Sequence, residues 1–212
     1  MSTVLAAILG GVAGYLLGAI PVGLLLGRVA GVEDLRAYGS GKTGFTNALR
    51  NLGLRWALLV VAGDIAKGAA AVLVGRLIIG EPWAAALAGA AAVLGHILPV
   101  FAGWRGGRGV ATAFGAFLAV APPAALVVVV FSAVILAVWR YASLMSVIGV
   151  LAGFLAIVAL VLTHQLATEY LAFALLTTIA VEVSHVENIR RLIAGTEPKL
   201  GRGGGPRPTA AH

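Results

Sequence analysis

Cysteine is absent from the sequence and charged residues are scarce. Without cysteine, disulfide bonds and thiolate chemistry are excluded. Only 11% of the residues are charged, against about one quarter in a soluble domain, and 60% are hydrophobic. The hydrophobic residues form recurring runs of about 20, the length of a helix that crosses a bilayer. These features indicate a polytopic membrane protein, and the spans should be helices because no strand-like alternation is present.

We expect an all-α, polytopic membrane helix bundle with about seven transmembrane helices, one of them short. The expected helices cover residues 4–26, 54–79, 83–101, 108–120, 124–139, 144–162 and a last run that ends near residue 183. Pro21 should kink the first helix, and Pro122 with Pro123 should end the short fourth one. We expect residues 1–201 to form a single transmembrane domain and residues 202–212 to be a flexible tail rich in glycine and proline.

Basic residues are concentrated in alternate connections between the expected helices. If the N-terminus lies outside and seven helices cross, all of the 15 Lys and Arg residues except Lys67 and Arg76 fall on the cytosolic side. The positive-inside rule therefore predicts that the glycine-rich connections face the cytosol. This rule, together with an anionic substrate, also accounts for the net charge of +7, so we expect no nucleic-acid partner.

The segment GWRGGRG, at residues 103–109, holds four glycines and two arginines. Glycine lets backbone N–H groups approach an anion, and the forked guanidinium of arginine matches phosphate oxygens. A helix that begins at Arg108 would add its positive N-terminal dipole. The segment therefore predicts half of a phosphate-binding site at the membrane surface. It contributes the candidate residues Arg105, Gly106, Gly107, Arg108 and Gly109.

A second glycine-rich segment lies in the polar loop between the first two expected helices. Residues 39–44 read GSGKTG. The segment is not a nucleotide-binding P-loop, because Arg36 stands where that motif needs glycine and no strand precedes it. Its hydroxyl groups, backbone amides and basic side chains still suit phosphate, although a flexible cytosolic loop is the simpler interpretation. The candidate residues here are Gly39, Ser40, Gly41, Thr46, Asn47 and Arg50.

Polar residues near the end of the chain complete the candidate set. His185 and Asn188 are three residues apart and so share one face of a helix. Arg190 could bind phosphate, or it could act with Arg191 as a topology anchor after a membrane helix.

Three ionisable residues fall inside expected membrane helices. Asp64 and Lys67 are functional candidates by position, but their i,i+3 spacing also allows a structural ion pair. His96 could be a ligand or a base, although a lone histidine is more often satisfied by a helix neighbour. No cluster of cysteine, histidine and carboxylate residues has metal-ligand spacing, so we expect no metal and no cofactor.

Together, these motifs resemble those of the bacterial acyl-phosphate:glycerol-3-phosphate acyltransferases, integral membrane enzymes of phospholipid synthesis. The resemblance covers nearly the whole chain and rests on the segments at residues 19–23, 34–50, 95–112, 140–146 and 185–201. The family pattern usually has asparagine at the position of Lys42 and lysine at that of Arg108. The second change keeps the charge but replaces a point charge with a planar fork.

The resemblance implies an enzyme that transfers a fatty acyl group from acyl phosphate to glycerol 3-phosphate. The products would be lysophosphatidic acid and phosphate, in the first acylation step of phospholipid biosynthesis. The site would lie on the cytosolic face of the inner membrane, among membrane lipids. The implied catalytic residues are Ser40, Arg50, Arg108, His185 and Asn188. The phosphate-binding set also includes Ser143, Arg190 and Lys199.

Two questions stay open at this point. The hydroxyl proton could go to His185 or to a substrate phosphate, whose second pKa of about 6 suits it to accept a proton. A transporter of a phosphorylated metabolite or lipid is the alternative function. Transporters place their polar site near the membrane midplane between repeated halves, whereas here the polar groups gather at one face and no repeat is evident.

Overall fold

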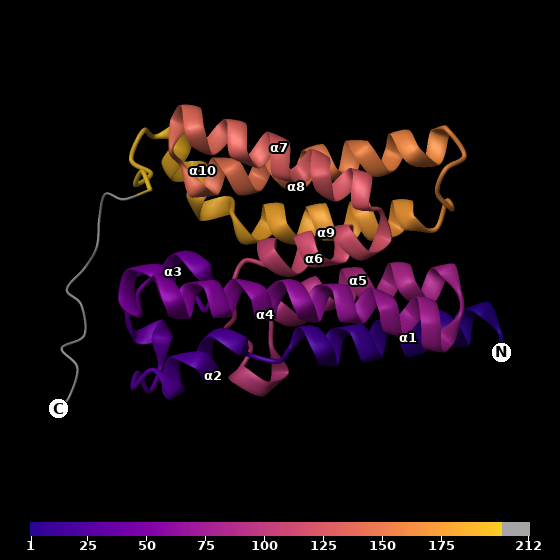
Figure 1. Cartoon of the computed structure of the whole chain (residues 1–212), viewed down its shortest axis with the longest axis horizontal. Coiled ribbons are helices and arrows are strands. Elements are labelled where there is room, and N and C mark those ends of the chain that lie inside the picture. Colours follow the sequence, from indigo (N-terminus) through magenta and orange to yellow (C-terminus); the bar gives the residue numbers. More distant parts are fainter. Residues whose placement is uncertain (201–212) are drawn as a thin grey trace.

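The computed structural model describes residues 1–200, and all the regular elements in that range are helices. Figure 1 shows the long helices running side by side along the length of the molecule. The all-α expectation is therefore confirmed, while the expected tail at 202–212 lies outside the described residues. The helices are α1 (Thr3–Gly18), α2 (Val22–Val29), η1 (Leu35–Ala37), α3 (Phe45–Asn51), α4 (Leu54–Leu73), η2 (Val74–Ile79), α5 (Pro82–Ile97), η3 (Val100–Ala102), α6 (Val110–Val120), α7 (Pro122–Trp139), α8 (Ala142–Leu162), α9 (Tyr170–Ser184) and α10 (Val186–Ile193).

Among residues 1–200, five helical stretches are long and apolar enough to cross a membrane, and a sixth joins them if α9 and α10, bent by 60°, count as one span. The short helix α6 is apolar but has only 11 residues. The predicted count of seven, one of them short, thus matches the fold approximately. The five stretches are Thr3–Val29, Leu54–Ile79, Pro82–Ala102, Pro122–Trp139 and Ala142–Leu162.

The expected kink at Pro21 is present as a break between α1 and α2. Two other boundaries differ from expectation. Helix α6 begins at Val110 rather than at Arg108, because Gly109 has a left-handed backbone (φ 80°) that interrupts any helix there. Helix α6 ends at Val120 as expected, with Ala121 extended before Pro122. Pro122 and Pro123 also open α7, which was expected to begin at residue 124, since the first turn of a helix tolerates proline without loss of a hydrogen bond.

Small residues let two pairs of helices touch through their backbones. Glycines on α1 face alanines on α5, and a Cβ added at Gly14 or Gly18 would overlap the backbone of Ala88 or Ala92. Similarly, Gly68 of α4 meets the backbone of Thr112 in α6. In a membrane, such close contacts replace the hydrophobic drive that water would supply. They fix the short α6 firmly against α4.

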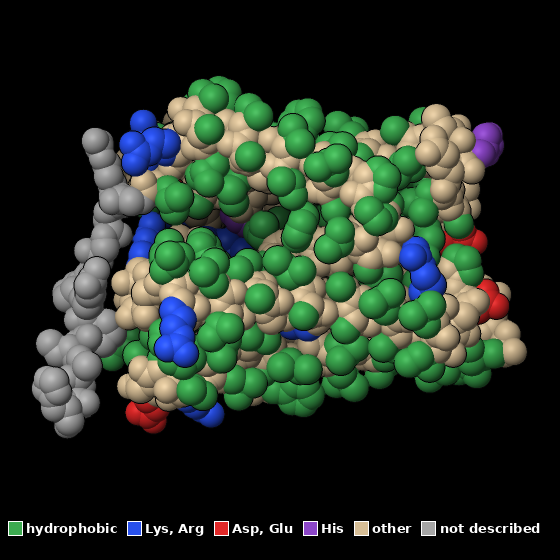
Figure 2. Space-filling model, in the orientation of Figure 1, with side chains coloured by type: hydrophobic (Ala, Val, Ile, Leu, Met, Phe, Trp, Pro, Cys, Tyr) green, Lys and Arg blue, Asp and Glu red, His purple; other side chains and the backbone are tan. Residues whose placement is uncertain are grey.

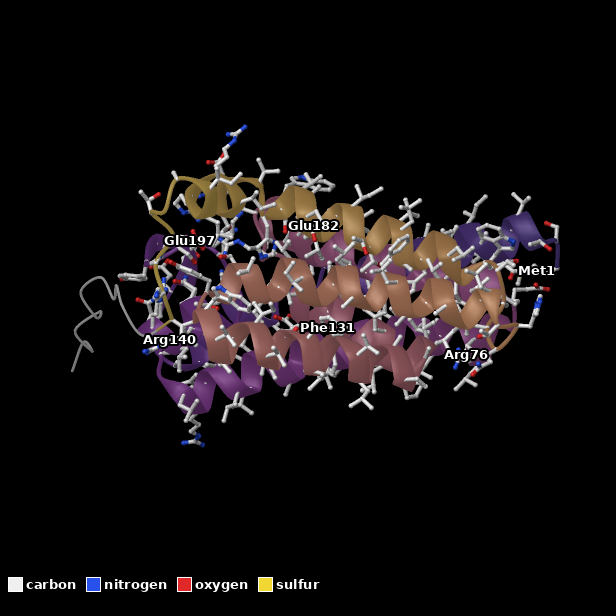
Figure 3. All side chains as sticks on the ribbon, turned by 90° about the horizontal axis from the view of Figure 1, so that it is seen from above. Met1, Arg76, Phe131, Arg140, Glu182 and Glu197 are labelled. Carbon is white, nitrogen blue, oxygen red and sulfur yellow. The ribbon has the colours of Figure 1, made fainter. Side chains whose placement is uncertain are left out.

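Helices α7, α8 and α9 form the other part of the bundle, and α6 lies between them and the group of α1, α4 and α5 (Figure 1). The central contact joins Phe117 of α6 to Phe173 of α9, whose rings meet edge to face with centroids 5.0 Å apart. Both side chains are fully buried. The candidate site lies in the seam between the two groups and is lined by Glu197, which is at the end of the molecule opposite Met1 (Figure 3).

Candidate active site

A cavity of about 420 Å³ lies in the seam between the two groups of helices. Figure 2 shows a hollow in this region, with basic and histidine side chains visible inside it. One part of its wall is polar, formed by Ser40, Lys42, Thr46, Asn47, Arg50, Arg108, Ser143, His185, Asn188, Arg191 and Glu197. Another part is apolar, formed by Val61, Ile65, Val110, Phe114, Val128, Val129 and Met145.

The loop between α2 and α3 is tied to the glycine–arginine segment by Arg36. Its Nη1 donates hydrogen bonds to the carbonyl oxygens of Ala102, at 2.7 Å, and Arg105, at 3.1 Å. Its Nη2 pairs with Asp34 at 2.8 Å. Hydrogen bonds from Arg36 keep the pKa of the Asp34 carboxyl below its usual range, although partial burial opposes them. This link joins the two segments that the sequence singled out, and sequence reasoning missed it.

Asn47 organises the loop internally. Its Nδ2 lies within 3.0 Å of the carbonyl oxygens of Leu35, Tyr38 and Lys42. Its Oδ1 accepts a hydrogen bond from the backbone N–H of Ser40 at 3.1 Å. Most of the hydrogen-bonding capacity of the Asn47 amide is thereby used within the loop. Ser40 lines the cavity, and its backbone N–H is held by the Asn47 side chain.

Gly39 has a left-handed backbone (φ 58°), and a Cβ there would overlap Oδ1 of Asn47. Gly41 is also left-handed (φ 67°). Neither glycine is among the residues that line the cavity. In this structure the two glycines shape the loop that presents Ser40 and Lys42.

The two central glycines of the glycine–arginine segment pack against α5. The Gly106 N–H donates to the Ile97 carbonyl and the Gly107 N–H donates to the His96 carbonyl, each at 3.1 Å. Their amides are therefore committed to the protein, and a Cβ at either position would collide with His96. The sequence predicted that the backbone N–H groups of these glycines would face an anion. In the structure the lack of side chains at Gly106 and Gly107 instead lets the turn pack closely against His96.

Arg108 follows those glycines and lines the cavity. Its carbonyl accepts a hydrogen bond from Ser184 Oγ at 3.0 Å, which fixes the backbone against α9. Its buried Nε has no hydrogen-bond partner among residues 1–200. The pKa of the Arg108 guanidinium lies below its ordinary value, because burial lowers it by more than the nearby Glu197 carboxylate raises it. A buried guanidinium donor without a protein partner is suited to bind an anionic ligand.

Glu197 joins three segments at the polar end of the cavity. Its Oε1 accepts hydrogen bonds from Ser143 Oγ at 2.6 Å and Asn188 Nδ2 at 2.7 Å. Its Oε2 pairs with Arg191 Nε at 2.7 Å. Burial raises the pKa of Glu197, but these three donors lower it by more, so the pKa lies below its ordinary value. Neither Glu197 nor Arg191 was a candidate from the sequence, where Arg191 was read as an anchor.

His185 is 1% exposed and lies between α9 and α10. Its Nδ1 is 2.8 Å from the Val181 carbonyl oxygen, and because a carbonyl only accepts, Nδ1 carries the ring proton. Nε2 of the neutral ring is then an acceptor. Within residues 1–200, no carboxylate lies within hydrogen-bond distance of the ring. Asn188 Oδ1 is also buried without a hydrogen-bond partner in that range.

Several predicted residues lie outside the cavity lining. Arg190 pairs with Glu187 at 2.9 Å, and both side chains are 71% exposed. Lys199 lies over the ring of Tyr141, with its ammonium 5.5 Å from the centroid. Arg105 contributes its carbonyl to Arg36. The predicted residues that do line the cavity are Ser40, Thr46, Asn47, Arg50, Arg108, Gly109, Ser143, His185 and Asn188.

The cavity carries an excess of positive charge. Lys42, Arg50, Arg108 and Arg191 line it, and the carboxylates in the lining are Glu197 and Asp64, of which Asp64 is paired with Lys67. Burial lowers the pKa of the Lys42 ammonium, and Arg108 and Arg105 lower it further, so these cations crowd one another. An anionic ligand would relieve this repulsion. The sequence left the role of Lys42 open, and the structure puts it in the same wall as Arg108.

The fold and the site define a multi-pass integral membrane protein with a cationic cavity that continues along apolar walls. The chain belongs to the glycerol-3-phosphate acyltransferase family, whose model matches residues 8–195. Among curated relatives, "Glycerol-3-phosphate acyltransferase 3" of Dehalococcoides mccartyi is 42% identical over 202 residues, covering 88% of this chain and 92% of the relative. The glycerol-3-phosphate acyltransferase of Cereibacter sphaeroides is 42% identical over 201 residues, covering 95% and 93%.

Two solved structures are similar to this fold. Both are of PlsY (YgiH), an integral membrane glycerol 3-phosphate acyltransferase. The glycerol 3-phosphate form is 37% identical, with a TM-score of 0.83 over 92% of this chain and 96% of that one. The lysophosphatidic acid form is 35% identical, with a TM-score of 0.82, and the match covers 92% of this chain and 95% of that one. The family expected from the sequence is therefore confirmed.

Proposed function

We propose that this enzyme transfers a fatty acyl group from acyl phosphate to glycerol 3-phosphate, the first acylation step of phospholipid biosynthesis. A glycerol 3-phosphate hydroxyl oxygen attacks the acyl carbonyl carbon, and the bond from that carbon to the phosphate oxygen breaks. The products are lysophosphatidic acid and phosphate. The observation that carries this proposal is a single cavity that combines a cationic polar wall with an apolar wall between membrane helices. The names of the relatives and solved structures support the acceptor and the product.

The polar wall suits two phosphate groups. Arg50 comes from α3 and Arg108 from the turn before α6, and both line the cavity. Ser40 supplies a hydroxyl group, and His185 with Asn188 closes the wall from the side of α10. Because acyl phosphate is already activated, the protein mainly needs to align the two substrates and stabilise developing charge. We propose that these five side chains contact the substrates.

The apolar wall suits the acyl chain. Val61 and Ile65 come from α4, while Val128 and Val129 come from α7 on the other side of the seam. The hollow in Figure 2 is open on a face of the molecule that is covered with hydrophobic side chains. We propose that a lipid-like acyl phosphate enters sideways from the bilayer and that lysophosphatidic acid leaves by the same route.

The proton acceptor follows from the hydrogen bond of His185. The ring is oriented by the Val181 carbonyl, which stabilises an imidazolium less than a carboxylate does. A substrate phosphate has a second pKa of about 6 and is itself at the reaction centre. We therefore propose that a substrate phosphate accepts the hydroxyl proton, while His185 binds and orients a substrate.

The orientation in the membrane is also a proposal. Figure 3 places Met1 and Arg76 at one end of the bundle and Arg140 and Glu197 at the other. The basic residues of the cavity lie at the Glu197 end. The positive-inside rule then supports an N-terminus outside and a cavity that faces the cytosol at the inner membrane.

Purified protein in detergent or lipid should test the reaction directly. With palmitoyl phosphate and isotopically labelled glycerol 3-phosphate, we expect labelled lysophosphatidic acid and one phosphate released for each acyl group transferred. Palmitoyl-coenzyme A in place of palmitoyl phosphate should give no product. Product formed from the coenzyme A ester alone would refute the proposed donor, and no acylated product from either donor would refute the proposed function.

A further inference from the structure

Three ionisable side chains meet in the membrane interior behind the glycine–arginine turn. Asp64 Oδ1 is 3.0 Å from Lys67 Nζ and 3.3 Å from His96 Nδ1. All three side chains are at most 6% exposed. The ion pair that the sequence allowed is thus present, and His96 from α5 joins it. Buried charges are expensive inside a membrane, so a cluster of this kind needs an explanation beyond stability.

His96 contacts the turn that carries Arg108 in two ways. Its carbonyl oxygen accepts a hydrogen bond from the Gly107 N–H at 3.1 Å. Its ring packs on the same glycine, since a Cβ built on Gly107 would overlap ring atom Nε2. The ring thereby occupies the place that a side chain at residue 107 would take. The position of the Gly107 backbone depends on where the His96 ring stands.

The orientation of that ring is fixed from α4. Nδ1 points to the Asp64 carboxylate, and Lys67 neutralises that carboxylate from the next turn. Lys67 also donates a hydrogen bond at 2.9 Å to the carbonyl oxygen of Ile20, in the break between α1 and α2. The cluster therefore connects four helices to one turn. Asp64 and His96 also line the cavity, so a shift of either side chain would change the shape of the cavity wall.

We propose that His96, oriented by the Asp64–Lys67 ion pair, is a positioning residue that sets the Gly106–Gly107 turn and through it the Arg108 guanidinium at the cavity wall. The inference rests on the proposed acyl transfer, in which Arg108 binds a phosphate. A misplacement of about 1 Å at such a group can cost roughly 100-fold in rate. The cluster would thus act on the reaction through Arg108 and not through direct contact with the substrates.

A double-mutant cycle between His96 and Arg108 tests this relation. We expect His96→Leu to lower kcat/KM about tenfold in the wild-type background. In the Arg108→Ala background the same change should lower it by less than about twofold, because the group that His96 positions is already missing. His96→Asn should recover most of the activity, since the asparagine amide can present an N–H group to the Asp64 carboxylate, which lies 3.3 Å from Nδ1 in the structure.

Val72→Ala is the matched control for destabilisation. Val72 is fully buried in the same bundle but lies outside the cavity lining. We expect it to lower Tm with kcat/KM within about twofold of wild type in both backgrounds. Wild-type activity tests acyl transfer, whereas the cycle tests positioning, so the two can fail separately.

A second route covers the case in which His96→Leu does not give a folded protein. The paired change Asp64→Leu with Lys67→Met keeps the interior neutral and leaves the His96 ring without the acceptor that faces Nδ1. This double variant should also lower kcat/KM about tenfold in the wild-type background and by less than about twofold in the Arg108→Ala background. The proposal is overturned if either change lowers kcat/KM by the same factor in the Arg108→Ala background as in the wild-type background. It is also overturned if either change leaves kcat/KM of the wild-type enzyme unaltered. If neither of these variants nor His96→Asn folds, the cluster is structural and the proposal is overturned as well.

Discussion

Replacement of Arg108 by alanine is the most direct test of the cavity. The guanidinium lines the cavity, and its buried Nε has no hydrogen-bond partner among residues 1–200. Alanine would remove a charged hydrogen-bond donor from the cavity wall. On the scale of an oxyanion-hole donor, this loss costs about 2–4 kcal/mol in the transition state. We therefore expect kcat/KM to fall about 30- to 900-fold.

Arg108→Lys separates charge from shape. Lysine keeps the positive charge but has a point-like ammonium in place of a planar fork. We expect this variant to stay within about tenfold of wild type, because the family resemblance implies lysine at this position and because Lys42 and Arg50 also line the wall.

The assay is the rate of labelled lysophosphatidic acid formation from palmitoyl phosphate, measured over a range of each substrate. Arg190→Ala serves as the control, since Arg190 is a surface arginine that is 71% exposed and lies outside the cavity lining. It should change kcat/KM by less than about twofold. An Arg108→Ala enzyme within threefold of wild type would remove Arg108 from the site. A lysine variant as poor as the alanine variant would show that charge alone is not what the site uses.

Three further outcomes are expected. His185→Asn should raise KM but retain measurable turnover; a loss of about 100- to 10,000-fold in kcat with KM unchanged would instead make His185 the general base. Glu197→Gln should lower Tm at pH 7. Because the pKa of Glu197 is lowered in the folded protein, its stabilisation is present above its ordinary pKa of about 4.5 and is lost as pH falls further, so the Tm difference from wild type should shrink below about pH 4. Cysteine introduced at Gly41, in this cysteine-free chain, should react with an impermeant thiol reagent only after the cells are opened, and labelling of intact cells would invert the proposed orientation.

The sequence was sufficient for those features that depend on local composition. Apolar runs predicted an all-helical membrane bundle, and Pro21 predicted the break between α1 and α2. The two glycine-rich segments were singled out because they combine glycine with basic residues. In the structure Arg36 ties these segments together, and Arg50 and Arg108 line the same cavity.

Features that depend on contacts between distant segments could not be predicted. The roles of Gly106 and Gly107 follow from the position of the His96 ring and carbonyl, and a glycine that allows close packing has the same sequence pattern as one that exposes its amide. Glu197 appears in the sequence as one acid in a polar tail. Its function in the fold arises because Ser143, 54 residues away, donates to it.

The two basic residues that did not fit the charge pattern, Lys67 and Arg76, share one structural role. Each donates hydrogen bonds to carbonyl groups at the end of a helix or at a break between helices. Lys67 donates to the Ile20 carbonyl between α1 and α2 at 2.9 Å. Arg76 donates to the carbonyls of Ala119 and Val120, at the end of the short α6, at 3.0 and 3.1 Å. Carbonyl groups at the end of a short helix or at a helix break lack an intrahelical partner, and such groups are costly inside a membrane, so a donor from elsewhere in the fold stabilises them. The Ile20 carbonyl also accepts a hydrogen bond from the Val22 N–H at 3.0 Å, so Lys67 is its second donor. These exceptions to the positive-inside pattern therefore reflect hydrogen bonds at helix ends and breaks, and they do not weaken the orientation that the other basic residues support.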